Sequence, residues 1–326
     1  GTKPADSYGH TPYTFAGDTK MKVLLPIDGS AAANKAVEHV RSLSHDNPLD
    51  VIVVYVSYDP AQFSFQPWLR DWTEQEKLLT QKILDNAKQL LEPCCQSVKL
   101  VHGSGASVPF ILDHAQTSEV DLIVLGAKGH STIGRILLGS VSDSVASRAK
   151  CSVLVVRSNE DTHFPPKKLL LGFDKSIASR EAAAELMEWN FSRDIAVNVL
   201  SAVQNPYIYA TEGYVAEPIV VSPKQLAQVG EMAERMASQI AEHFPHTDSH
   251  AIVADHIGEA IVQAADDDKA DLVVVGDTGH TFLGELLLGS TSKYVLRHAH
   301  CSVLISRHHW KSADQTREAD DAVATT

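Results

Sequence analysis

The chain has 326 residues, of which 44% are hydrophobic and 21% charged, and its formal net charge at pH 7 is −13. This acidic balance argues against a nucleic-acid-binding protein, whose affinity comes mainly from clustered Lys and Arg, and no stretch approaches the roughly 18 apolar residues that a membrane-spanning helix needs. Four cysteines in so long a chain favour a reducing, cytoplasmic location over a disulfide framework. We therefore expect a soluble protein of two domains, each large enough to bury its own core.

Short apolar runs alternate with helical patterns along the chain. Strands are predicted at Lys22–Ile27, Val51–Ser57, Val98–His102, Leu122–Gly126 and Ser152–Arg157, and again at Lys168–Phe173, Ile195–Ala202, Ser249–Ala254, Leu272–Gly276 and Ser302–Ser306. Helices are predicted in the first half at Ala31–Leu43, Asp71–Leu91, Val108–Thr117 and Val141–Ala149. Such alternation predicts parallel sheets with helices on both faces, and the near-continuous apolar strands suit burial on both sides.

The second half of the chain repeats the first. At an offset of 150, residues 121–157 align with 271–307 without a gap, and 19 of the 37 positions are identical, where chance would give about 2 to 3. A repeat of this length is a duplicated domain, because solenoid repeats run about 20 to 50 residues. We predict a disordered extension over 1–20, a first domain over 21–158, a linker over 159–166, a second domain over 167–308 and a polar tail over 309–326. The short linker places the two domains side by side.

One Gly-rich segment follows the fourth strand of each half. The segments are Gly126-x2-Gly129-x9-Gly139-Ser140 and Gly276-x2-Gly279-x9-Gly289-Ser290. In an open α/β sheet, ligands sit beyond the carboxyl ends of the strands, which is where these glycines lie. Glycine permits positive φ and close backbone approach, while Gly-Ser at a helix start offers N–H donors and the positive end of the dipole. The segments therefore suit phosphate binding without lysine, although tight turns and helix caps explain the same residues.

An acidic residue ends the first strand of each half. These residues are Asp28, followed by Gly29-Ser30, and Asp174, followed by Lys175-Ser176. Asp and Ser are also favoured turn and N-cap residues, so both a ligand-binding and a purely structural interpretation stay open.

The G-x2-G-x9-G-[S/T] pattern, the acid that closes the first strand and the final Cys-Ser-Val-Leu strand resemble the ATP-binding group of the universal stress protein family. The resemblance covers Met21–Arg157 and Lys167–Arg307. It implies an α/β fold of two tandem domains, each an open five-stranded parallel sheet with helices on both faces, Rossmann-like and similar to the adenine nucleotide alpha hydrolases. It also implies that the halves pair through their last strands, and it leaves room for a homodimer of tandem chains.

The resemblance assigns candidate nucleotide-binding residues by position. In the first half they are Pro26, Asp28, Val56, Gly126, Gly129, Gly139, Ser140, Val141 and Ser142. Their counterparts are Gly172, Asp174, Ala202, Gly276, Gly279, Gly289, Ser290, Thr291 and Ser292. The second set offers less apolar wall to a base, because Gly172 replaces Pro26 and Ala202 replaces Val56.

The loop after the fourth strand also differs in charge between the halves. Its variable residues are Ala127, Lys128 and Arg135 in the first half and Asp277, Thr278 and Glu285 in the second. Two cations are lost and two anions are gained, so the second loop is four units more negative. We therefore predict that the first half binds ATP more tightly.

The leading hypothesis is a regulatory stress-response protein that binds ATP, ADP or AMP, with Mg²⁺, and acts on an unknown protein partner. At most weak ATP hydrolysis is expected, because no general base or arginine finger is evident. Two alternatives stay open: an ATP-using enzyme of the alpha hydrolase group, and a paired scaffold with vestigial sites.

Other signals carry less weight. Gly103-Ser104-Gly105 lacks the third glycine of a dinucleotide fingerprint, no Walker sequence is present, and the sixteen histidines show no zinc-ligand spacing. Cys151 and Cys301 begin apolar strands and are interpreted as small core residues. The aromatic segments 58–70 and 204–223 are either partner surfaces or loops packed on the core.

Overall fold

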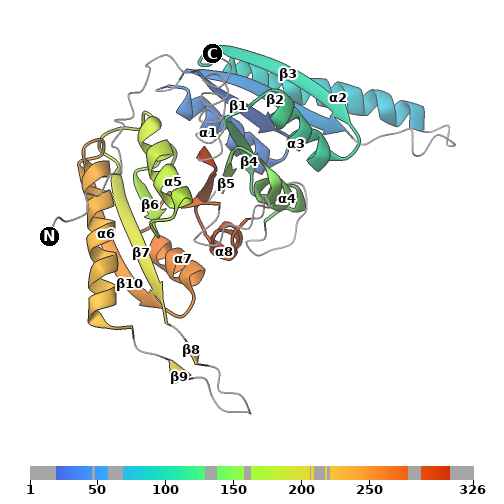
Figure 1. Cartoon of the computed structure of the whole chain (residues 1–326). Coiled ribbons are helices and arrows are strands. Elements are labelled where there is room, and N and C mark those ends of the chain that lie inside the picture. Colours follow the sequence, from blue (N-terminus) through green and yellow to red (C-terminus); the bar gives the residue numbers. More distant parts are fainter. Residues whose placement is uncertain are drawn as a thin grey trace, which may run out of the picture.

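A single ten-stranded sheet spans both halves of the molecule (Figure 1). The computed structural model describes residues 20–45, 48–57, 69–128, 138–157, 163–205, 207–208, 217–218, 221–277 and 288–308. The strand order is β10-β7-β6-β11-β12-β5-β4-β1-β2-β3. Within each half the five strands run parallel, and the two sets meet at the antiparallel pair β5–β12.

The elements follow the predicted alternation closely. The first half contains β1 Met21–Pro26, α1 Ala31–Leu43, β2 Leu49–Ser57, α2 Leu69–Leu91, β3 Ser97–Ser104, α3 Ser107–Thr117, β4 Leu122–Gly126, α4 Ser140–Arg148 and β5 Ser152–Val156. The second contains β6 Lys168–Gly172, α5 Ile177–Glu188, β7 Ala196–Gln204, β8 Tyr207–Ile208, β9 Glu217–Pro218, α6 Pro223–Ala241, β10 His246–Ala254, α7 Ile257–Asp267, β11 Leu272–Gly276, α8 Ser290–His298 and β12 Ser302–Ser306.

Two differences from the predicted elements have local causes. Strand β10 begins at His246, three residues before the predicted start, because the polar residues His246–Asp248 pair with β7 at the edge of the sheet. The aromatic segment 204–223 contains the antiparallel pair β8–β9. No alternating pattern of apolar residues predicted strands there. The N-terminal extension, the polar tail and residues 58–68 lie outside the described residues.

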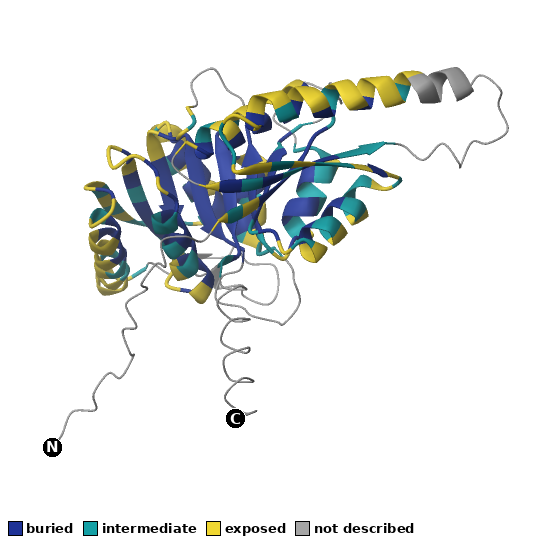
Figure 2. Cartoon of the chain, turned by 90° about the horizontal axis from the view of Figure 1, so that it is seen from above, coloured by how far each residue is buried: buried dark blue, intermediate teal, exposed yellow. Residues whose placement is uncertain are grey.

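Each face of the sheet is covered by its own set of helices, and each core runs through both halves. Leu25, Leu154, Leu171 and Leu304 belong to the cluster under α1, α2, α5 and α6. Val153 and its neighbours on the opposite side of each strand pack under α3, α4, α7 and α8. Figure 2 shows the resulting buried band along the strands. Within the described residues, no helix combines the length and apolar character that crossing a bilayer would require.

The antiparallel junction has the symmetry of a two-fold axis. Leu154 lies opposite Leu304, its own counterpart in the repeat, and Val155 and Val153 lie opposite Val303 and Ile305. An isologous contact of this kind places the same surface of each half against the other. The last strands therefore join the halves, as the resemblance implied.

Two buried arginines make equivalent contacts across the junction, one from each half. Arg157 Nη2 donates to Leu296 O near the end of α8 at 2.5 Å, and Arg307 Nη2 donates to Ala146 O near the end of α4 at 2.7 Å. The last turn of a helix leaves carbonyls without an intrahelical partner and favours a nearby cation. Burial lowers the pKa of Arg157 to about 10, so its guanidinium remains charged at neutral pH. Each half thus caps a helix of the other.

One buried carboxylate breaks the symmetry of the junction. Glu185 on α5 accepts hydrogen bonds from Ser152 Oγ at 2.8 Å and Ser306 Oγ at 2.5 Å, one from each of the paired strands. Burial raises the pKa of Glu185, an effect that these hydroxyls and His308 oppose. The equivalent position in the first half is His39, which instead packs on Phe164 of the linker at 4.3 Å between ring centroids.

His308 makes a further polar contact at the same place. Its Nδ1 lies 3.0 Å from Glu181 Oε2 and its Nε2 lies 2.9 Å from Glu188 Oε1. Burial alone would lower the pKa of His308, but the hydrogen bonds to both carboxylates and the charge of Glu188 raise it to about 10. The imidazolium therefore holds α5 against the chain that leaves β12.

The raised pKa of His308 predicts an alkaline loss of stability. Because the folded-state pKa lies above the ordinary value of 6.5, the contribution of His308 is complete below pH 6.5 and is lost as pH rises towards 10. His308→Gln is expected to lower the free energy of unfolding at pH 7 by about 2 kcal/mol. In this variant the free energy of unfolding should also fall less steeply between pH 7 and about pH 9.5 than in the wild type. Urea unfolding at pH 7 and about pH 9.5 measures both effects. His243→Gln, at an exposed histidine, is the control, and a His308→Gln protein with the wild-type pH dependence would contradict the assignment.

Candidate functional site

The predicted site residues of the first half converge on one cavity of about 340 Å³ at the carboxyl edge of β1 and β4. Those that line it are Pro26, Asp28, Val56, Gly126, Gly139, Ser140, Val141 and Ser142. Gly129 lies outside the described residues. Residues that are separate in sequence meet here because parallel strands end at the same edge of the sheet.

The N-terminus of α4 opens into this cavity without a side-chain cap. Gly139 is the N-cap residue, and its own N–H donates to Ala127 O at 2.7 Å. The first N–H groups of a helix have no intrahelical acceptor, and those of Ser140, Val141 and Ser142 donate to no residue in the described part of the chain. These three donors and the helix dipole suit an anion.

The Ser142 hydroxyl has a structural role. It donates to Gly126 O at 2.7 Å, which ties the first turn of α4 to the end of β4. A ligand can reach Ser142 through its N–H and the remaining lone pairs of its hydroxyl. The hydrogen bond therefore shapes the cavity that the residue also lines.

The structure supports the turn interpretation of Asp28. Asp28 Oδ1 accepts from Ser30 N at 2.9 Å, and Ser30 Oγ accepts from Ala33 N at 3.2 Å as the N-cap of α1. Asp28 also lines the cavity. One residue thus forms the strand-to-helix turn and presents a carboxylate to the site, so the two interpretations are compatible.

Gly126 is required by the packing of the chain on itself. A Cβ at this position would lie 2.5 Å from the carbonyl carbon of Ala32 at the start of α1. Its φ is not in the positive range, contrary to one of the reasons given for the glycine from sequence. Close approach of α1 to β4 is the cause, and it brings the Asp28 turn next to α4.

Substitution of Gly126 should therefore destabilise the fold. Gly126→Ala forces a backbone contact to open and is expected to cost about 1–3 kcal/mol of unfolding free energy. The matched control is Gly230→Ala on α6, where the added Cβ would meet only Ala251 Cβ at 3.7 Å and the gain in helix propensity should stabilise the protein by about 0.5–1 kcal/mol. Urea denaturation of both variants tests the contrast, and equal effects would refute it.

Sequence reasoning missed half of the cavity wall. The further lining residues are Ile27, Ser30, Ala33, Val54, Ser107, Ile111, Leu125 and Lys128. Val54 and Leu125 lie in β2 and β4, Ala33 lies in α1, and Ile27, Ser30 and Lys128 follow β1 and β4. The sequence had singled out Ser30 as a turn residue and Lys128 as a loop cation, but not as part of this wall. Ser107 and Ile111 come from the start of α3, which no motif marked, and the tertiary packing of α3 beside β2 brings them in.

The second half keeps the same backbone arrangement. Ser292 Oγ donates to Gly276 O at 2.6 Å, and Gly289 N donates to Asp277 O at 2.7 Å. Asp174 again forms the turn before a serine N-cap, with Ser176 N at 3.0 Å from its Oδ1. The residues Ser290 and Thr291 begin α8 as their counterparts begin α4, and Gly279 lies outside the described residues.

The second half has apolar side chains beside Gly172, the counterpart of Pro26. A Cβ at Gly172 would lie 3.1 Å from Val275 Cγ1 and 3.4 Å from Ile261 Cδ1. Val275 and Ile261 are the repeat counterparts of Leu125 and Ile111, which line the first cavity.

One acidic residue of the second loop is buried and pairs with an arginine. Asp277 is buried, and its Oδ2 lies 3.5 Å from Nε of the equally buried Arg307. Its charge is thus opposed by a cation of the same half. Glu285 and Arg135 lie outside the described residues, and Lys128 lines the first cavity.

A residue of the second half reaches the first turn of α4. Arg297 on α8 donates through Nε to Asp143 Oδ1 at 3.0 Å and through Nη2 to Oδ2 at 2.8 Å. Its hydrogen bonds, with its charge and that of Lys293, lower the pKa of Asp143 against the opposing effect of burial. Arg297 thereby opposes the charge of the acidic residue in the first turn of α4.

Cys301 is a core residue, and the partly buried Cys151 packs against the same core. Burial raises the pKa of the Cys151 and Cys301 thiols to about 12, so both are protonated at neutral pH. In the described parts of the chain, no group of three His, Cys, Asp or Glu side chains is placed to hold a metal ion.

Known proteins resemble the chain in both halves. The model of the universal stress protein family matches residues 20–157 and 166–307. A universal stress protein of Mycobacterium tuberculosis is 28% identical over 295 residues, covering 87% of this chain and 96% of the relative. One from Bacillus subtilis is 30% identical over 150 residues, covering 42% of this chain and 98% of the relative. The crystal structure of a universal stress protein from Archaeoglobus fulgidus shares the fold, with a TM-score of 0.65 at 17% identity over 88% of this chain and 98% of that one.

Proposed function

The chain belongs to the universal stress protein family, and on that basis we propose that its first half binds an adenine nucleotide in the cavity between β1, β4 and α4. The observation that carries the proposal is the convergence of the predicted residues around the uncapped N-terminus of α4. The cavity volume of about 340 Å³ falls within the range of about 300–1,000 Å³ that small-molecule sites occupy.

The lining residues fit the parts of ATP. Val54, Val56 and Ile111 offer an apolar wall to the base, and the Asp28 carboxylate is an acceptor suited to a ribose hydroxyl. The N–H groups of Ser140–Ser142 and the Lys128 ammonium offer donors to phosphates. A Mg²⁺ ion that enters with the nucleotide would take most of its ligands from phosphates and water, because this ion keeps several waters in protein sites.

The position of α4 suggests how binding is communicated. The N-terminus of α4 faces the cavity, while its last turn accepts from Arg307 and its Asp143 binds Arg297. A nucleotide that binds more tightly to one arrangement of these contacts would favour that arrangement. We therefore propose a regulatory module in which nucleotide occupancy alters the surface formed by α4 and α8.

Calorimetric titration of ATP and Mg²⁺ tests the proposed site. Gly139→Val is expected to weaken binding at least about tenfold. The φ of −65° and ψ of 148° at Gly139 are compatible with valine, and Gly139 lines the cavity, so we expect the added side chain to take space from the ligand. Gly289→Val is the matched variant at the counterpart N-cap, which has φ of −58° and ψ of 153°. We expect the stronger site to be lost only with Gly139→Val. Unaltered binding in that variant would rule out the cavity as the site.

The Arg297–Asp143 pair gives a second test. Arg297→Gln should weaken ATP binding by about two- to fivefold, since the Asp143 carboxylate would then repel phosphates at a partly exposed position. The double variant with Asp143→Asn should recover the wild-type affinity. Arg180→Gln, at an exposed arginine on α5, is the control, and failure of the double variant to recover would refute the electrostatic explanation.

The junction between the halves favours one other function. The paired strands, Arg157, Arg307 and Glu185 hold the halves together through contacts that need no ligand. A paired scaffold that acts through protein contacts is therefore the second candidate. Absence of ATP binding in wild-type protein free of co-purified nucleotide would select it.

A further inference from the structure

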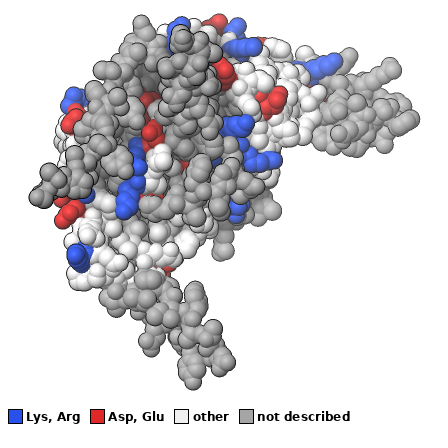
Figure 3. All heavy atoms as spheres, in the orientation of Figure 1, with Lys and Arg blue, Asp and Glu red and all other residues white. Residues whose placement is uncertain are grey.

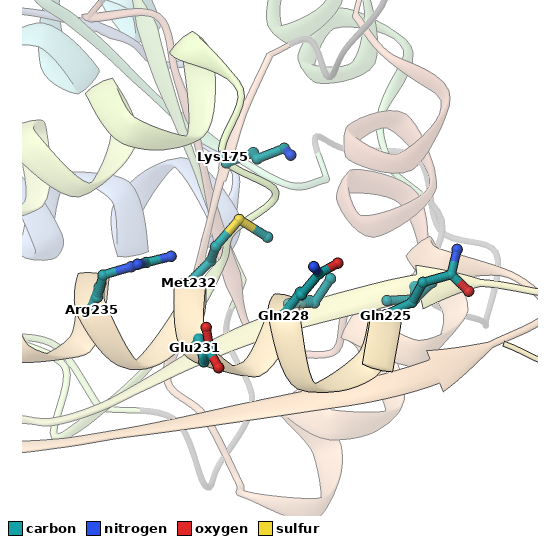
Figure 4. A pocket seen from close by; sticks show the side chains of 8 residues that line it. Lys175, Gln225, Gln228, Glu231, Met232 and Arg235 are labelled. Atoms are coloured by element: carbon teal, nitrogen blue, oxygen red, sulfur yellow. The ribbon is translucent and has the colours of Figure 1, made fainter. Parts of the chain in front are cut away.

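A second cleft lies between α6 and the loop after β6, beside the turn that Asp174 forms. It has a volume of about 530 Å³, and it is separate from the Gly-rich segments. Figure 4 shows Arg235, Met232, Gln228 and Gln225 along α6, with Lys175 on the loop facing them. Their spacing of three to four residues places the four helix residues along one side of α6.

Two cationic side chains line the cleft. Among the described residues, neither the Lys175 ammonium nor the Arg235 guanidinium forms an ion pair or a side-chain hydrogen bond. The anion among the lining residues is Glu231, which turns away from Lys175 in Figure 4. With two cations and one anion, the lining of the cleft is net positive, whereas basic and acidic side chains are mixed on the face drawn in Figure 3.

The backbone at Lys175 is unusual for a side chain of this kind. Its φ is 60°, in the left-handed region that glycine adopts at no steric cost. The counterpart in the first half is Gly29, with φ of 78°. The exchange of glycine for lysine places a cation at the mouth of the cleft, at a position where the backbone favours glycine.

The first half has no room for an equivalent cleft at this point. A Cβ on Gly29 would lie 2.6 Å from Ile83 Cδ1 on α2, so α2 and the turn are in direct contact. In the second half, Met232 occupies the position of Ile83 and lines the cleft with Val203 and Val229. At this turn the cleft is therefore a feature of the second half and not of the repeat as a whole.

We propose that this cleft binds a small phosphate monoester, with the phosphate between Lys175 and Arg235 and an apolar body against Met232. The two cations match the two charges of the dianion, and the guanidinium fork matches two of its oxygens. The Gln225 and Gln228 amides supply neutral donors, and the half-buried Met232 accommodates groups of varied shape. This site is independent of the nucleotide proposed for the first half.

The test is a titration of the full chain with phenyl phosphate. Binding is monitored through amide chemical shifts and by calorimetry, and inorganic phosphate is the comparison ligand. We expect saturable shifts around Lys175 and over residues 225–235, a dissociation constant of about 1 mM or below, and weaker binding of inorganic phosphate, which has no apolar body. Binding should weaken further as salt is raised.

Variants at the two cations separate this site from the nucleotide site. Lys175→Gly, which suits the left-handed backbone and should leave thermal stability unreduced, and Arg235→Gln should each weaken phenyl phosphate binding at least about threefold. Lys224→Gln, an exposed lysine on the same helix, is the matched control, and Gly139→Val should leave this binding intact. Shifts confined to residues 139–142, wild-type affinity in the Lys175→Gly and Arg235→Gln proteins, or no saturable shifts up to about 10 mM would overturn the proposal.

Discussion

The antiparallel pairing of β5 with β12 is the constraint on which the rest of the structure depends. Without it, each half would expose an edge strand made mainly of apolar residues, and such an edge can pair with other chains. With it, Val153–Val155 and Val303–Ile305 become the centre of a ten-stranded sheet, and both hydrophobic cores continue from one half to the other. The chain therefore behaves as one body with two repeats.

That pairing also gives α4 its double role. The same nine-residue helix presents its N-terminus to the cavity of the first half and its C-terminal carbonyl to Arg307 of the second. A helix transmits a small displacement along its axis because its hydrogen bonds make it stiff. Helix α4 thus connects the proposed ligand site directly to the junction, although the residues of these two places are far apart in sequence.

The duplication has diverged at positions where the two copies face different neighbours. Glu185 bonds both paired strands, whereas its counterpart His39 packs on the linker. Lys175 borders an open cleft, whereas its counterpart Gly29 is pressed against α2. This divergence is compatible with a symmetric junction. Residues near the two-fold axis contact their own counterparts and are constrained by both halves, whereas residues away from the axis contact one half only.

The sequence by itself determined the order of elements, the duplication and the turn residues of the site, because these depend on local periodicity and on spacings within a few residues. Strands such as Leu122–Gly126 and Leu272–Gly276 were predicted to the residue, and the predicted residues of the first half lie together because strand ends share an edge. Only the tertiary structure decided that Ser107 and Ile111 complete the cavity, that Arg307 opposes the charge of Asp277, and that Arg297 reaches Asp143. Those contacts join segments separated by up to about half the chain, and their geometry follows from how helices pack on the sheet and how the halves pair, which no local pattern encodes.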